Sequence, residues 1–228
     1  TDAPALRPVL RKDFLLDEED IELSYRAGAD IVLLIAALLD ANTLAALHAR
    51  AAELGMAALV ELYTEEDAEK ARALAPPFVG INSRDLTTFR VDSLHPLGVA
   101  AHVDWPASLI YESGVFAAEG ARFAASSGFS GLLVGEAVMR EPDLVGELAA
   151  GLAVGAGEAQ SREGAGRASG AAPARISGAG ARKGAARGFW RRLARRRAER
   201  RRAHYHPGSA HELAAGEAPA ARRPLVKI

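Results

Sequence analysis

Ionisable or amide side chains occur at the ends of five of the six short apolar runs in this sequence. The clearest are Lys12, Glu61, Asn82, Glu112 and Glu136. The carboxyl ends of parallel strands lie at one edge of a sheet, so groups placed there converge on one pocket. A lysine and carboxylates in one pocket suit proton transfer, whereas each residue alone would be an ordinary surface charge or turn residue. Together they are candidates for acid–base chemistry.

The apolar runs and the longer periodic segments between them are the elements that must position these groups. We expect strands at 8–10, 31–35, 58–62, 78–81, 109–111 and 132–134. We expect helices at 17–27, 40–54, 65–74, 92–101, 117–127 and 142–152. In the second of these helices, Leu44, Leu47, Ala51 and Leu54 follow the spacing of one buried face.

The regular alternation of strands and helices favours an α/β fold with parallel pairing through helical crossovers. A (β/α)8 barrel needs eight such units within roughly 200 to 250 residues. Six units therefore predict a TIM barrel whose first two units are missing, and we interpret the start at Thr1 as a truncation. An open doubly wound sheet would carry a glycine-rich turn after its first strand. The corresponding turn, Lys12-Asp13-Phe14, has no glycine.

Charge divides the chain into two parts. Residues 1–154 contain 11 Lys+Arg and 24 Asp+Glu, whereas the remaining residues contain 17 and 5. We expect a partial barrel over 1–154, followed over 155–223 by a disordered, low-complexity Ala/Gly/Arg-rich linker that has too few large aliphatic residues to fold. Within this linker, 189–204 is a candidate short basic helix.

Composition restricts the classes of function. The absence of cysteine rules out disulfides and thiolate metal sites. No apolar run reaches the ~18 residues of a membrane span. The six histidines have no convincing ligand spacing. We therefore expect a cytoplasmic protein that contacts no membrane and uses no metal and no cofactor.

Four strings resemble the signature sequences of indole-3-glycerol phosphate synthases. They are PVLRKDF at 8–14, GINSRDLTTF at 80–89, ESG at 112–114 and LVGEAVMR at 133–140. They occur in family order and at family spacing between about Pro8 and Leu152. The resemblance implies a TIM-barrel carboxy-lyase of tryptophan biosynthesis. Its substrate would be 1-(2-carboxyphenylamino)-1-deoxyribulose 5-phosphate, whose ring closes with loss of carbon dioxide and water.

The resemblance also implies catalytic roles. Lys12 matches the general acid of the family, and a cation at the substrate carbonyl can polarise it as the aryl carbon attacks. Glu61 matches the carboxylate that exchanges protons and stabilises charge on the anilino nitrogen. Asn82 and Glu112 match residues that orient the substrate.

Substrate binding would involve two further groups of residues. The loops Ser113–Gly114 and Gly135–Glu136 correspond to the usual phosphate site of barrels, where backbone N–H groups face the anion. Arg84 matches the charged phosphate contact, and Glu136 would help only through its backbone. The anthranilate ring would lie against an apolar wall. This wall consists of Phe14, Leu86 and Leu133, of which Leu133 has ordinary core packing as an equal alternative.

Two other interpretations stay open. The family places a Glu-x-Lys pair on its first strand, and no such strand is present here, so the chain is alternatively a catalytically incomplete barrel fragment. The other is a phosphate-binding TIM barrel of different chemistry with a nucleic-acid-binding tail at Arg191–Arg202. For this tail we favour a solvated linker over nucleic-acid contact.

The end of the chain suggests a fusion. Residues 224–228, PLVKI, resemble the first strand of phosphoribosylanthranilate isomerase, which is fused to the synthase in some organisms. A fused isomerase domain is therefore a candidate partner, with an independent tail as the alternative.

Overall fold

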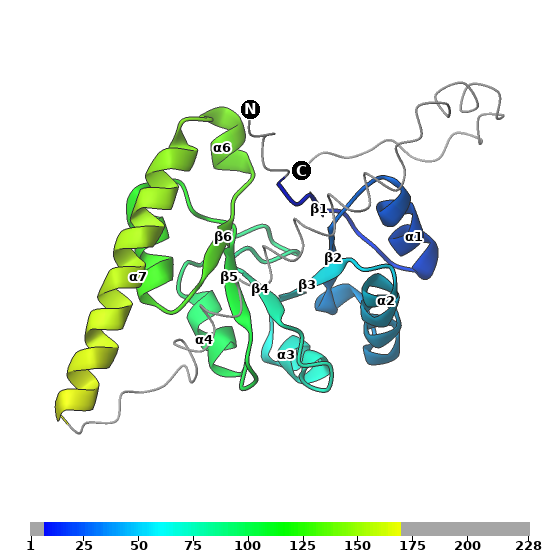
Figure 1. Cartoon of the computed structure of the whole chain (residues 1–228), viewed down its shortest axis with the longest axis horizontal. Helices are drawn as coiled ribbons and strands as arrows, with labels where there is room; N and C mark the ends of the chain where they lie inside the picture. Colours follow the sequence, from blue (N-terminus) through cyan, green and yellow to red (C-terminus); the bar gives the residue numbers. More distant parts are fainter. Residues whose placement is uncertain (1–6, 170–228) are drawn as a thin grey trace, which may run out of the picture.

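Six parallel strands form one curled sheet in the computed structural model, which describes residues 7–169 (Figure 1). Each strand pairs with the next one along the chain, in the order β1-β2-β3-β4-β5-β6. The strands are β1 (Leu10–Arg11), β2 (Ile31–Ile35), β3 (Ala57–Leu62), β4 (Phe78–Asn82), β5 (Ser108–Glu112) and β6 (Gly131–Leu133). The expected partial TIM barrel of six βα units is confirmed.

Helices connect the strands and cover one face of the sheet (Figure 1). They are α1 (Glu18–Arg26), the 3-10 helix η1 (Ala36–Leu38), α2 (Ala41–Glu53), α3 (Glu65–Arg72), α4 (His95–Ala101), α5 (Ala118–Ser126), α6 (Glu136–Arg140) and α7 (Leu144–Ser169). Side chains that precede the first turn fix several helix starts. Thr64 and Asp67, for example, form a reciprocal capping box at α3, which satisfies backbone donors that the helix leaves free.

Side chains alternate between two apolar regions along each strand. Val32, Leu34 and Val60 point toward the helices and belong to the main core. Leu33 and Leu59 point to the opposite, concave face and belong to a smaller cluster. Since successive strand residues face opposite sides, Glu61 lies on the same face as Leu59. The concave face is therefore apolar in its middle and polar at the carboxyl ends of its strands.

Two short helices were not predicted, and one predicted helix begins later than expected. The 3-10 helix η1 and the helix α6 occupy segments that we expected to be loops. Helix α4 begins at His95 rather than at residue 92. The preceding segment folds back on itself, with a bridge between Arg84 and Val91 and a turn closed by the Asp85 carbonyl and the Phe89 N–H.

The prediction of disorder from Gly155 is wrong for residues 155–169, because α7 continues to Ser169. The small residues that suggested a linker instead allow close helix packing. A Cβ atom at Gly155 would lie 2.1 Å from the Arg122 carbonyl oxygen on α5. Arg122 also forms an ion pair with Glu158 of α7. Contact with α5 therefore supplies the tertiary support that composition alone did not indicate.

The other expectations for the C-terminal part concern residues that lie outside those described. They are the rest of the linker to residue 223, the basic helix at 189–204 and the strand at 224–228. Within residues 7–169, no helix is long and apolar enough to cross a membrane.

Candidate active site

Lys12, Glu61, Asn82 and Glu112 lie together at the carboxyl ends of β1, β3, β4 and β5. In the strand register, Glu61 is level with Gly80 and Asn82 is level with Glu112. The Asn82 side chain donates a hydrogen bond of 2.9 Å from Nδ2 to Glu61 Oε1. Lys12 Nζ lies 3.8 Å from Glu61 Oε2. The four residues predicted to be catalytic therefore share one site.

The four side chains differ sharply in exposure. The Lys12 side chain is 53% exposed, whereas Glu61 and Glu112 are buried at 2% and 1%. Asn82 is buried with them. The arrangement places a solvent-accessible cation above a buried layer of two carboxyl groups and an amide. A ligand that entered from the open side would meet Lys12 first.

Glu112 is the most perturbed group of the site. Neither of its carboxyl oxygens has a hydrogen-bond partner among the described residues. Burial, together with the negative charge of Glu61, raises the pKa of Glu112 well above the ordinary value of 4.5, and Lys12 offsets only part of this effect. Ionising two adjacent buried carboxyl groups costs free energy, because both lose their hydration and the two negative charges repel each other. Of the two, Glu112 is therefore the group that binds its proton more tightly than an ordinary glutamate.

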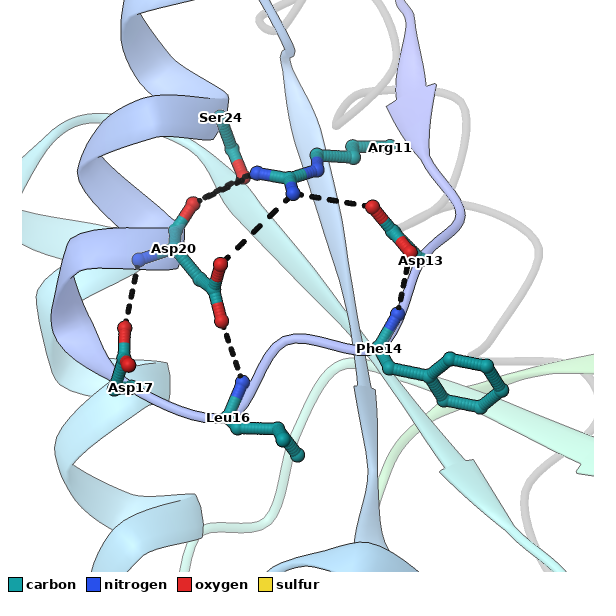
Figure 2. A network of polar contacts seen from close by, with 7 residues as sticks. All are labelled: Arg11, Asp13, Phe14, Leu16, Asp17, Asp20 and Ser24. Carbon is teal, nitrogen blue, oxygen red and sulfur yellow. Dashed lines mark hydrogen bonds and ion pairs between the residues drawn. The ribbon is translucent and has the colours of Figure 1, made fainter. Parts of the chain in front are cut away.

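Arg11 anchors the strand end that carries Lys12 (Figure 2). Its side chain points away from the site, toward α1. Its Nη1 donates to the Asp20 carbonyl at 3.0 Å and to Ser24 Oγ at 2.9 Å, and its Nη2 lies 3.1 Å from Asp13 Oδ2. One guanidinium group thus ties both the strand end and the following loop to the helix.

The carboxylates bound by Arg11 also hold the backbone of this loop. Asp13 accepts a hydrogen bond from the Phe14 N–H, and Asp20 accepts one from the Leu16 N–H (Figure 2). Sequence reasoning missed this network, although Arg11 immediately precedes Lys12 in the string that carries the resemblance. Successive side chains in a strand face opposite sides. If Lys12 faces the site, its neighbour Arg11 must therefore face the helices, and this alternation could have revealed the network.

The predicted phosphate residues form a second cluster around Arg84. The Arg84 backbone N–H donates to Asn82 Oδ1 at 3.0 Å, which links this cluster to the acid–base residues. Its Nη2 lies 3.5 Å from Glu136 Oε2 at the start of α6. Glu136 also pairs with Arg140 at 2.9 Å. The Glu136 side chain, for which no side-chain role was predicted, therefore partly neutralises Arg84.

The Ser113–Gly114 turn follows β5 next to this cluster. Both residues have left-handed backbones, with φ of +66° and +69°. The Ser113 N–H donates to the Leu133 carbonyl at 3.4 Å, which connects the turn to β6. Gly135 is the N-cap residue of α6. A left-handed conformation is unfavourable for serine, so the surrounding structure must hold this turn.

The predicted apolar wall is only partly assembled. Leu86 and Leu133 are partly buried and pack against the small cluster on the concave face. Phe14 is instead 54% exposed. Two of the three residues therefore share a surface, whereas the Phe14 ring projects into solvent from the β1–α1 loop.

Gly80 is a site residue for which the sequence predicted no role. It lies level with Glu61 on the neighbouring strand, and the Glu112 carboxyl group occupies the space where a side chain at position 80 would be. The available signal was a lone glycine inside a strand pattern, which marks a close approach by another group.

Comparisons with known proteins show which family this chain is similar to. A profile of the family described as indole-3-glycerol phosphate synthase matches residues 3–150. Indole-3-glycerol phosphate synthase of Roseiflexus castenholzii is 40% identical over 148 residues, which cover 64% of this chain and 55% of that protein. The same enzyme of Chromobacterium violaceum is 42% identical over 136 residues, covering 60% and 51%. The chain thus spans about half the length of the curated relatives it matches.

One solved structure is informative about the fold alone. The chain is similar to 3-hexulose-6-phosphate synthase from Salmonella typhimurium, with a TM-score of 0.55 and 18% sequence identity. The similarity covers 66% of this chain and 74% of that one.

Proposed function

This chain belongs to the indole-3-glycerol phosphate synthase family, and from this premise we propose that it acts in the ring closure of 1-(2-carboxyphenylamino)-1-deoxyribulose 5-phosphate. The reaction forms indole-3-glycerol phosphate and releases carbon dioxide and water. The observation that carries the proposal is the convergence of Lys12, Glu61, Asn82 and Glu112 at the carboxyl ends of four strands.

Lys12 acts as the general acid. The aryl carbon that bears the carboxylate attacks the substrate ketone, and Lys12 gives a proton to the oxygen that becomes a hydroxyl group. Loss of carbon dioxide returns the electron pair of the broken carbon–carbon bond to the ring. Lys12, reprotonated from solvent, gives a second proton to the hydroxyl group, which leaves as water. The partial exposure of Lys12 supports this role, because its ammonium group reaches the open side of the site.

Glu61 stabilises the positive charge that develops on the anilino nitrogen and accepts the proton that the carbon next to this nitrogen loses when the indole ring forms. Its position is fixed by the hydrogen bond from Asn82 and by the nearby Lys12. Glu112 and Asn82 orient the substrate, Glu112 as a neutral acid that can donate a hydrogen bond. Fixing the substrate in a near-attack geometry lowers the entropic part of the barrier.

The phosphate group binds at Arg84 with the backbone of the Ser113–Gly114 and Gly135–Glu136 loops. The Glu136 carboxylate lies 3.5 Å from Arg84 and is about half exposed, so its hold on the guanidinium group is weak. A dianionic phosphate is a stronger partner for Arg84 and displaces it. Leu86 and Leu133 support the anthranilate ring, and Phe14 covers it from the loop after β1.

Calorimetry and an absorbance assay on the purified chain test the proposal. We expect the substrate to bind, and indole-3-glycerol phosphate to form, with K12M lowering turnover by about 10²-fold or more. R26M, which removes an exposed cation of α1 far from the strand ends, is the control and leaves both quantities unchanged. Binding without turnover would support the proposed identity of the substrate and would contradict the proposal that this chain carries out the whole reaction. Absence of binding would contradict both.

Location and partners complete the proposal. A protein of this metabolic role acts on a small phosphorylated molecule, and we place it in the cytoplasm. A fused isomerase domain stays a prediction from residues 224–228.

A further inference from the structure

Gly80 stands at the centre of the buried carboxyl layer. It lies level with Glu61 in the pairing of β3 with β4, and level with Ile110 in the pairing of β4 with β5. A Cβ atom at position 80 would lie 1.7 Å from Glu112 Oε1 and 2.8 Å from Glu112 Cδ. Both distances are far below van der Waals contact. The Glu112 carboxyl group therefore occupies the volume that any other residue at position 80 would fill.

We propose that Gly80 is a positioning residue of this site, because its missing side chain makes the space in which the carboxyl group of Glu112 lies against that of Glu61. This inference rests on the proposed function and adds a residue to its machinery. The two carboxyl groups come from β5 and β3, which are not paired with each other, so they can meet only across β4. Gly80 and Asn82 are the residues of β4 that face them.

The groups around this space determine what the pair can do. Glu61 faces Glu112 from β3, Lys12 approaches from the end of β1, and Asn82 supplies its amide from β4. Neither carboxyl oxygen of Glu112 has a hydrogen-bond partner among the described residues, and the group lies directly over Gly80. The negative charge of Glu61 adds to the effect of burial in raising the pKa of Glu112. A methyl group at position 80 forces the Glu112 carboxyl group away from Glu61 and weakens this effect.

Carboxyl carbon NMR of the full chain, followed through a pH titration, tests the proposal. In the wild type, we expect the Glu112 signal, assigned by its loss in E112Q, to titrate at a pH well above the usual range of about 4 to 5. In G80A, the midpoint should fall by at least about one pH unit. G131A is the matched control, since it adds a methyl group on β6 that meets only the flexible end of Ile110, at 3.0 Å. It should leave the midpoint unchanged.

An unchanged Glu112 midpoint in a folded G80A would overturn the proposal. If G80A does not fold, the double variant G80A/E112A decides, because it removes the group that the new methyl meets. Restored folding in the double variant supports the proposal, and continued failure to fold contradicts it. These measurements use no substrate, so their outcome is separate from that of the binding and turnover assays.

Discussion

The amide of Asn82 and the carboxylate of Glu61 are joined by a buried hydrogen bond of 2.9 Å between neighbouring strands. The same amide accepts a hydrogen bond from the Arg84 backbone through its oxygen. Asn82 therefore satisfies one oxygen of the buried carboxylate and orients the first residue of the phosphate loop. A single side chain couples the acid–base cluster to the anion cluster.

Replacing Asn82 by alanine should destabilise the protein by about 1–3 kcal/mol, because Glu61 Oε1 would remain buried without its donor. Chemical denaturation of N82A measures this loss. N42A, at an exposed position in the first turn of α2, is the matched control and should change stability by no more than about 0.5 kcal/mol. Equal stability of N82A and N42A would contradict the importance of this hydrogen bond.

The raised pKa of Glu112 predicts a stability that falls as pH rises. The folded state retains a proton on Glu112 at pH values where the unfolded chain, with a pKa near 4.5, has released it. The folded state therefore binds more protons, and the free energy of unfolding decreases with pH above that value. E112Q should remove this decrease and be more stable than the wild type at about pH 8. E119Q, on the exposed side of α5, should keep the wild-type dependence of the free energy of unfolding on pH. If E112Q showed the same dependence as E119Q, the raised pKa of Glu112 would be refuted.

Arg11 should be required for a rigid β1–α1 loop. R11K retains the charge but loses the forked contacts with Asp13, Asp20 and Ser24. We expect amide exchange at Phe14 and Leu16 to become about 10-fold faster or more, as expected for loss of about 1.4 kcal/mol of local stability. R26K, which affects only a surface pair with Glu22, is the control. Unchanged exchange in R11K would show that the loop is held by other contacts.

Neutralising Glu136 should strengthen anion binding. E136Q removes the carboxylate that lies 3.5 Å from Arg84 Nη2, so a phosphate no longer competes with it. We expect calorimetry to give a several-fold tighter dissociation constant for the substrate, whereas R84Q should weaken binding. E141Q, just beyond the end of α6, is the control. Weaker binding by E136Q would place the phosphate elsewhere or give the Glu136 carboxylate a binding role.

Two glycines of α7 should respond in opposite ways to the same substitution. G155A places a methyl group 2.1 Å from the Arg122 carbonyl oxygen and should separate α7 from α5. G157A meets nothing within 4 Å, so it should stabilise the helix by about 0.5–1 kcal/mol through its higher helix propensity. Thermal unfolding compares the two. A G155A variant as stable as G157A would contradict the packing of residues beyond 154 against α5.

The sequence predicted the sheet well because its strands are apolar runs bounded by turn residues. The predicted strand at 31–35 coincides with β2, and the polar residues at the carboxyl ends of β3, β4 and β5 converge as expected. The predicted helix at 142–152 ended earlier than α7 does, because glycine and alanine suggest a linker when the surface that they pack against is unknown. The support that extends it comes from Arg122 and Ala125 of α5, which are distant in sequence.

The supporting residues of the site were harder to predict than its chemical groups. Lys12 and Glu61 are conspicuous because of their charge, whereas Gly80 matters through the space that it leaves. Arg11 faces away from the site, and its partners on α1 become visible only when the helix is in place. The Glu136–Arg84 pair likewise depends on α6, a helix too short to give a clear periodic signal.

A crystal structure of the chain with a reduced substrate analogue, in which the ketone is an alcohol, tests the roles of Lys12, Glu61 and Arg84 together. If these residues have the proposed roles, the alcohol oxygen lies about 3 Å from Lys12 Nζ, the anilino nitrogen lies next to Glu61, and the phosphate lies at Arg84. An analogue bound away from Lys12 and Glu61, or with its phosphate remote from Arg84, would contradict these roles.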